Sequence, residues 1–159
     1  MVRKTETRSL SDEPVFLFDE DLIAHGKTLA TIYPETVHVA TLGDAPAKRT
    51  PDGGMYSWCL ARGAIFVTAD FNMLRDQAVL KDLLSRVGLR VIWVKQIKGQ
   101  SVSREIERIV GRWTHIRKTV VDRSECMGFV LAGNGRLVPY RSISDVVVEV
   151  VNRRSSRGR

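Results

Sequence analysis

Residues 64–70 read Ala-Ile-Phe-Val-Thr-Ala-Asp, an apolar run that closes on an acid, and residues 15–19 repeat this pattern as Val-Phe-Leu-Phe-Asp. Short, wholly apolar runs are typical of strands that are buried on both faces of a parallel sheet. The carboxyl ends of parallel strands meet at one edge of the sheet, where open α/β proteins bind their ligands. We therefore expect Asp19 and Asp70 to face one crevice.

Strand-like and helix-like segments alternate along the chain. The patterns predict strands over residues 15–18, 36–40, 64–68 and 89–94 and helices over residues 21–32, 54–61, 74–87 and 101–118. This alternation predicts an α/β fold in which a mostly parallel sheet lies between two layers of helices. Further along, Gly133-Asn134-Gly135 separates two apolar runs and predicts a C-terminal β-hairpin, and residues 142–151 are compatible with a final strand.

The chain carries an excess of positive charge. Its 159 residues have a formal net charge of +7, and part of the excess lies in an Arg/Ser/Gly-rich tail. A basic balance of this size indicates a polyanionic partner such as nucleic acid, or an acidic protein. The longest apolar runs are too short to cross a bilayer, and the basic amino-terminal segment lacks the apolar stretch of a signal peptide. We therefore expect a cytoplasmic protein with no membrane partner.

Three acids are candidate metal ligands. Asp19 and Asp70 end predicted strands, and Asp52 stands at the start of a predicted helix between them. Carboxylates that converge on one point repel one another unless a cation lies between them, and Mg²⁺ or Mn²⁺ prefers such oxygen ligands. The pattern therefore predicts metal-assisted phosphoryl chemistry, in which an activated water attacks a phosphodiester.

Four further residues support this set. Glu20, Asp21 and Asn72 are outer members of the acidic site, and the hydroxyl of Thr68 is placed to orient a carboxylate. The acids that precede helices also have a structural explanation, because Asp before a helix commonly caps it. Capping does not explain why two separate strands both close on an acid.

The strand and Thr-x-Asp motif at residues 65–71, together with the run at residues 18–22, resemble the PIN-like nucleases, and among them the toxin components of VapC-type toxin–antitoxin pairs. The resemblance covers roughly residues 15–95. It implies a PIN-like α/β/α sandwich and a Mg²⁺- or Mn²⁺-dependent endoribonuclease, the toxin of a type II pair. Carried over to this sequence, the resemblance assigns the catalytic metal ligands to Asp19, Asp52 and Asp70.

Four segments and several partners follow from the sequence and the resemblance. We assign residues 1–13 to a flexible N-terminus, 14–123 to a PIN-like nuclease domain, 124–151 to a C-terminal β-hairpin or strand extension and 152–159 to a basic disordered tail. The expected partners are an RNA substrate and a cognate antitoxin, in a homodimer or a toxin–antitoxin hetero-oligomer. The candidates for contact with RNA phosphates are Lys27, Arg62 and Arg75.

Two other interpretations stay open. A receiver-like phosphoacceptor domain also carries acids after its first strand and an Asp after its third, and Lys95 after the fourth predicted strand resembles that family's lysine. The basic charge and the long amphipathic helix fit this interpretation poorly. The other interpretation is a non-catalytic PIN-like module that binds nucleic acid or a partner. Metal-dependent RNA cleavage separates the nuclease from both.

Overall fold

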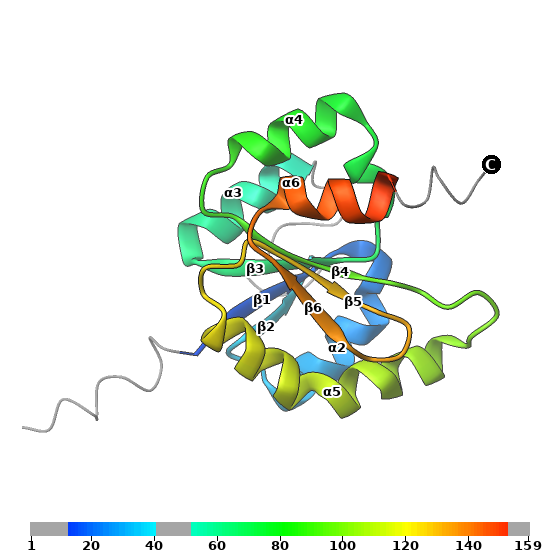
Figure 1. Cartoon of the computed structure of the whole chain (residues 1–159). Coiled ribbons are helices and arrows are strands. Elements are labelled where there is room, and N and C mark those ends of the chain that lie inside the picture. Colours follow the sequence, from blue (N-terminus) through cyan, green and yellow to red (C-terminus); the bar gives the residue numbers. More distant parts are fainter. Residues whose placement is uncertain (1–12, 41–51, 153–159) are drawn as a thin grey trace, which may run out of the picture.

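A single sheet organises the chain, whose computed structural model describes residues 13–40 and 52–152. Its strands are β1 (Val15–Phe18), β2 (Val37–Val39), β3 (Ala64–Thr68), β4 (Arg90–Val94), β5 (Gly128–Leu131) and β6 (Leu137–Tyr140). The six strands lie in the order β2-β1-β3-β4-β5-β6, in which β1 to β5 are parallel and β6 is antiparallel to β5 (Figure 1). The predicted α/β fold with a mostly parallel sheet is thus confirmed.

Helices cover both faces of this sheet. The α-helices are α2 (Ile23–Ile32), α3 (Asp52–Arg62), α4 (Gln77–Ser85), α5 (Val102–Asp122) and α6 (Ile143–Val146). Three short helical segments accompany them, namely η2 (Glu20–Leu22), η3 (Phe71–Leu74) and η4 (Val147–Asn152). Helices α2 and α5 lie on one face of the sheet, and α3, α4 and α6 lie on the other (Figure 1). This arrangement is consistent with the sandwich that the alternation predicts.

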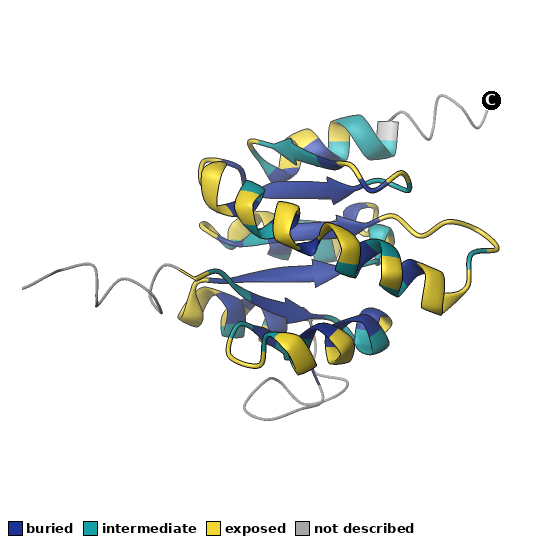
Figure 2. Cartoon of the chain, turned by 90° about the horizontal axis from the view of Figure 1, so that it is seen from below, coloured by how far each residue is buried: buried dark blue, intermediate teal, exposed yellow. Residues whose placement is uncertain are grey.

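The strands are apolar on both faces because each face is covered by helices. All five residues of β3 are buried, and Figure 2 shows buried strands between helices whose outer sides are exposed. On one face, the ring of Trp113 in α5 packs 4.7 Å from that of Phe16 and 5.7 Å from that of Phe18, measured between centroids. On the other face, Tyr56 of α3 packs edge-to-face on Phe66 at 5.7 Å. Each layer of helices therefore has its own aromatic contact with the sheet.

Strand β1 lies where the strand order reverses. From β1 the chain passes through α2 to β2 on one side, and then through α3 to β3 on the other side. The order 2-1-3-4-5 is the flavodoxin-like arrangement, in which the ligand binds outside the carboxyl ends of β1 and β3. This general rule makes the β1/β3 edge the candidate ligand-binding crevice.

The last two strands belong to the main sheet. Strand β5 pairs with β4 as well as with β6, so the antiparallel pair forms one end of the same sheet that β1 to β4 build. Gly135 adopts a φ of +86° between the two strands, a conformation that glycine reaches without a steric penalty. The N–H of Gly135 donates to the carbonyl of Ala132 at 2.9 Å, in the turn that joins the two strands.

The segment after β6 is helical, and the final strand expected over residues 142–151 is wrong. The hydroxyl of Ser142 accepts the N–H of Asp145 at 3.1 Å and caps α6 at its start. Ile143 and Val146 are buried and lie three residues apart, the spacing of one helical face. This cap and this spacing outweigh the strand preference of the valines that follow.

Three segments lie outside the described residues, namely 1–12, 41–51 and 153–159. The predicted flexible N-terminus falls there except for Glu13, and so does the basic tail except for Asn152. Within the described ranges, no helix combines the length and the apolar character needed to span a bilayer.

Helix α2 packs so closely on the sheet that Gly26 has no room for a side chain. A Cβ atom at Gly26 would lie 2.7 Å from Cβ of Phe18 and 2.8 Å from Cγ2 of Val39. Gly26→Ala should therefore lower the free energy of unfolding by about 1–3 kcal/mol, because an overpacked core displaces its neighbours.

Gly111→Ala in α5 is the matched control. Nothing lies within 4 Å of a Cβ atom at Gly111, so the substitution should raise the free energy of unfolding by about 0.5–1 kcal/mol through helix propensity alone. Urea unfolding of the two variants measures both effects. Equal stability changes at the two positions would contradict the close packing of α2.

Candidate functional site

Asp19 is held by the neighbouring strand as well as by its own. Its backbone N–H donates to the carbonyl of Val67 at 2.9 Å, which continues the parallel pairing of Phe18 with Val67. The residue that follows β1 therefore lies beside the last residue of β3, Thr68. This pairing brings the first acid to the carboxyl edge of the sheet, at the switch point.

The side chain of Thr68 is fully buried, and its hydroxyl links three acids. The hydroxyl oxygen lies 3.0 Å from Oδ2 of Asp19 and 3.3 Å from Oδ2 of Asp21, so its single proton can serve either carboxylate. The same oxygen accepts the backbone N–H of Asp70 at 3.1 Å. The backbone N–H of Ala69 donates to Oδ2 of Asp21 at 3.1 Å. Asp19 and Asp21 are thereby oriented toward one point.

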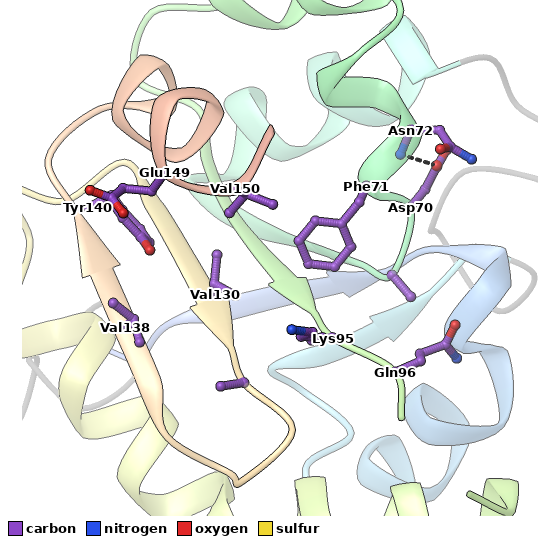
Figure 3. A pocket seen from close by; sticks show the side chains of 12 residues that line it. Asp70, Phe71, Asn72, Lys95, Gln96, Val130, Val138, Tyr140, Glu149 and Val150 are labelled. Carbon is purple, nitrogen blue, oxygen red and sulfur yellow. Dashed lines mark hydrogen bonds between the residues drawn. The ribbon is translucent and has the colours of Figure 1, made fainter. Parts of the chain in front are cut away.

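Two of the acids also cap helical segments. Oδ1 of Asp19 accepts the N–H of Glu20 at 2.8 Å, at the start of η2. Oδ1 of Asp70 accepts the N–H of Asn72 at 2.9 Å, at the start of η3 (Figure 3). Capping, the structural explanation for acids before helices, therefore applies to both residues. In Asp19 the cap uses one carboxylate oxygen and the contact with Thr68 uses the other.

Burial and mutual repulsion raise the pKa values of two of the acids. Burial is the main reason that the pKa of Asp19 lies above its usual value, and the charges of Glu20 and Asp70 raise it further. Partial burial of the carboxyl group, followed by the charge of Asp19, raises the pKa of Asp21 to about 6. Hydrogen bonds from Thr68 and from backbone amides oppose both shifts. Among the described residues, the charges that act on these two pKa values belong to other carboxylates.

The donor set suits a hard divalent cation. Mg²⁺ in proteins takes one or two carboxylates and completes its shell with waters and substrate phosphate, and Asp19 and Asp21 supply two such oxygens side by side. The described residues contain no group of three or more His, Cys, Asp or Glu side chains arranged to hold a metal ion. Asp52 begins α3, but its side chain lies outside the described part of the chain. The acids that the structure brings together are those that follow β1 and β3.

The three predicted RNA-contacting cations do not all belong to the same edge of the sheet. Lys27 and Arg75 are exposed, and they belong to segments that begin at the acidic edge, α2 and the turn after η3. Arg62 ends α3 just before β3 begins, so it lies at the opposite edge, where its guanidinium stacks 4.3 Å from the ring centre of Trp58. The length of β3 separates Arg62 from Asp70 by roughly 20 Å.

A cleft of about 570 Å³ opens beside Asp70 (Figure 3). Its walls come from the turn after β3, from the ends of β4 and β5, from β6 and from η4. Lys95 and Gln96, which follow β4, line it together with Asp70. The sequence marks Lys95 only as a receiver-like lysine, and it gives no local signal for a cleft that distant segments build.

A buried polar pair joins α2 to α5. Nε2 of His25 lies 2.6 Å from Oε1 of Glu105, and each of these residues is 4% exposed. Nε2 of Gln96 donates to the same Glu105 oxygen at 3.0 Å, which connects the rim of the cleft to the helical layer. No role was predicted for His25 or Glu105. The sequence nevertheless contains a signal for a buried pair. Glu105 shares the buried face of α5 with Ile109 and Trp113, and an acid on a buried face needs a partner.

Comparisons with protein-family models, with curated proteins and with solved structures find no match to this chain. Its chemistry therefore has to be inferred from the geometry of the described residues. Two features carry that inference, namely the acids that Thr68 links and their position at the switch point of the sheet.

The raised pKa of Asp21 should make the stability of the metal-free protein depend on pH. The folded protein keeps this proton up to about pH 6, whereas the usual carboxyl pKa is 3.8, so the folded state binds more protons than the unfolded state between these values. The free energy of unfolding therefore falls as the pH rises through this window. Asp21→Asn removes that fall. The free energy of unfolding of the variant should therefore rise relative to that of the wild type from about pH 4 to pH 6, and the difference should stay constant above pH 6.

Urea unfolding of both proteins across this pH range, in buffer without divalent cations, measures the effect. The difference between the two proteins cancels the contributions of titrating groups that do not interact with Asp21, and it reports Asp21 together with its coupling to Asp19 and Asp70. A stability difference that does not vary with pH would contradict the raised pKa.

Proposed function

We propose that this protein is a metal-dependent endoribonuclease with a PIN-like fold, which cuts RNA phosphodiester bonds with a water that Mg²⁺ or Mn²⁺ activates. The observation that carries the proposal is the contact of the Thr68 hydroxyl with Asp19, Asp21 and the backbone of Asp70 at the switch point. Acids gathered at such an edge, among which Asp19 and Asp21 have raised pKa values, support a site for a divalent cation. The net charge of +7 supports a polyanionic substrate.

The residues of the chain would share two tasks, holding the cation and holding RNA. Asp19 and Asp70 would hold the cation, with Asp21 as a further oxygen ligand beside Asp19, and Thr68 would fix the orientation of the Asp19 and Asp21 carboxylates. Mg²⁺ or Mn²⁺, when bound, supplies an activated water for attack on phosphorus and offsets the charge that builds there. The carboxylates position the cation and do not act as covalent nucleophiles. Exposed cations near this edge that could contact RNA phosphates include Lys27, Arg75 and Lys95.

Loss of either acid should abolish cleavage. Asp19→Asn and Asp70→Asn keep the side-chain size and remove the charge, so each should lower the rate of RNA cleavage in Mg²⁺ by about 100-fold or more. Thr68→Val should lower the rate by about 10- to 100-fold, the usual effect of losing a partner that orients a metal ligand. Incubation of the purified proteins with total RNA in Mg²⁺, in Mn²⁺ and in EDTA measures these rates.

Two variants control for loss of the fold. Thr68→Ser keeps the hydroxyl and should cut RNA at close to the wild-type rate. Asp122→Asn removes an exposed carboxylate that pairs with Lys118 at the far end of α5, and it should leave cleavage unchanged. Cleavage that persists in EDTA and in Asp70→Asn would indicate a contaminating nuclease and would contradict the proposal.

A phosphoacceptor domain is the second candidate, because the strand order favours it. The 2-1-3-4-5 order is also that of receiver domains, and Asp70 and Lys95 line one cleft. Two features speak against it, namely the antiparallel strand that follows β5 and the 21 residues of α5. Incubation with acetyl phosphate separates the two candidates. Phosphorylation at Asp70 without RNA cleavage would replace the nuclease proposal.

We also propose that this nuclease is the toxin of a type II toxin–antitoxin pair. An anionic edge favours an antitoxin segment that brings an Arg side chain to the acids. Co-expression with the product of an adjacent small reading frame should give a stable complex in which RNA cleavage is suppressed. Light scattering would report whether the complex is a hetero-oligomer or contains a homodimer of this chain. Failure of every neighbouring product to bind would contradict the toxin assignment and leave the nuclease proposal standing.

A further inference from the structure

The proposed cation site does not account for the cleft beside Asp70. Its floor is formed by β5 and β6, one wall is the start of η3, and the opposite wall is η4 (Figure 3). The volume of about 570 Å³ lies within the range of small-ligand sites, which is about 300–1,000 Å³. The cleft therefore has room for a group of the size of a nucleoside.

Part of the cleft lining is apolar and includes an aromatic ring, and the other lining residues include the polar side chains of Asn72, Gln96, Tyr140 and Glu149. Val130 of β5 and Val138 of β6 are paired neighbours whose side chains lie on one face of the sheet, and Val150 of η4 lies opposite them. Phe71 directly follows Asp70, and Figure 3 shows its ring pointing into the cleft toward Val150. A flat heteroaromatic group fits between an aromatic ring and aliphatic side chains, because it can stack on one and pack on the other.

The rim of the cleft carries a positive charge, that of Lys95, on a backbone segment that hydrogen bonds hold in place. Of the described residues that line the cleft, Lys95 is the only cation. Its backbone N–H donates to the carbonyl of Leu131 at 2.9 Å, and its carbonyl accepts Nη2 of Arg108 at 3.0 Å. The neighbouring Gln96 side chain is held by Glu105. The segment after β4 is therefore anchored on both sides before any ligand binds.

We propose that this cleft is a nucleoside subsite, which receives the base of one unstacked RNA nucleotide. The inference rests on the proposed ribonuclease function. The base stacks on Phe71, a phosphate of that nucleotide meets Lys95, and the scissile phosphate lies toward Asp70, because Asp70 and Phe71 are consecutive. A base enters the cleft only when it is splayed out of a helix, so the subsite selects single-stranded RNA over duplex RNA.

Binding of a fluorescently labelled single-stranded RNA hexamer in EDTA tests the subsite without cleavage. Phe71→Leu keeps apolar bulk and lacks the ring, so it should weaken binding about fivefold or more, the effect of losing one base–aromatic stack. Phe71→Tyr keeps the ring and should bind within about twofold of the wild type. Lys95→Gln should weaken binding and reduce its salt dependence by about one phosphate contact, whereas Lys95→Arg should preserve both.

A set of hexamers, each of which lacks one base, identifies the nucleotide whose base stacks on Phe71. In the wild type, removal of one particular base should weaken binding as much as Phe71→Leu does, and in Phe71→Leu removal of that base should have no further effect. Phe71→Leu that binds like the wild type, or equal affinity for a duplex of the same sequence, overturns the subsite even when Mg²⁺-dependent cleavage holds. Ring-dependent binding by a protein that cuts no RNA supports the subsite and overturns the ribonuclease proposal instead.

Discussion

The hydroxyl group of Thr68 is the contact on which the acidic edge depends. It donates to a carboxylate that follows β1 and accepts the N–H of the acid that follows β3. The carboxylates of Asp19 and Asp21 both lie within 3.3 Å of the Thr68 hydroxyl, which has one proton to donate. Asp21 accepts a further hydrogen bond, from the N–H of Ala69. The like charges stay close together, and burial of the carboxyl groups, followed by repulsion from neighbouring carboxylates, raises the pKa values of Asp19 and Asp21. Repulsion of this kind at a ligand-binding edge is typical of functional sites.

The sheet makes this contact available. The parallel pairing of β1 with β3 sets Phe18 opposite Val67, so the residues just beyond the two strands meet. A shift of one residue in this register would turn Phe16 and Phe18 away from Trp113 of α5, so the specific packing of the helical layers opposes it. The pair of His25 and Glu105 joins the two helices of one layer. The acids thus lie on short turns that a rigid scaffold positions, the usual arrangement of a functional site in this class of fold.

The strands and long helices could be predicted from the sequence because their patterns are local. Strand β3 is apolar up to its last residue, Thr68, and α5 carries a long stripe of apolar residues. The helix after β6 could not be predicted in this way, because its valines favour a strand and only the cap at Ser142 opposes them. The placement of Asp19 and Asp70 at one edge of the sheet could be predicted, because each of them closely follows its own strand. The cleft was not, because Phe71, Lys95 and η4 meet only through the strand order, which no local pattern encodes.

Binding of Mn²⁺ in the absence of RNA tests most directly whether the acids that Thr68 links form a cation site. Paramagnetic broadening of backbone amide signals in an NMR titration reports both the affinity and the location. We predict one site per chain, with broadening centred on residues 19–21 and 68–72, with affinity lost in Asp19→Asn and lowered about 10- to 100-fold in Thr68→Val. Broadening centred elsewhere, or Mn²⁺ affinity that is unchanged in Asp19→Asn, would contradict this claim.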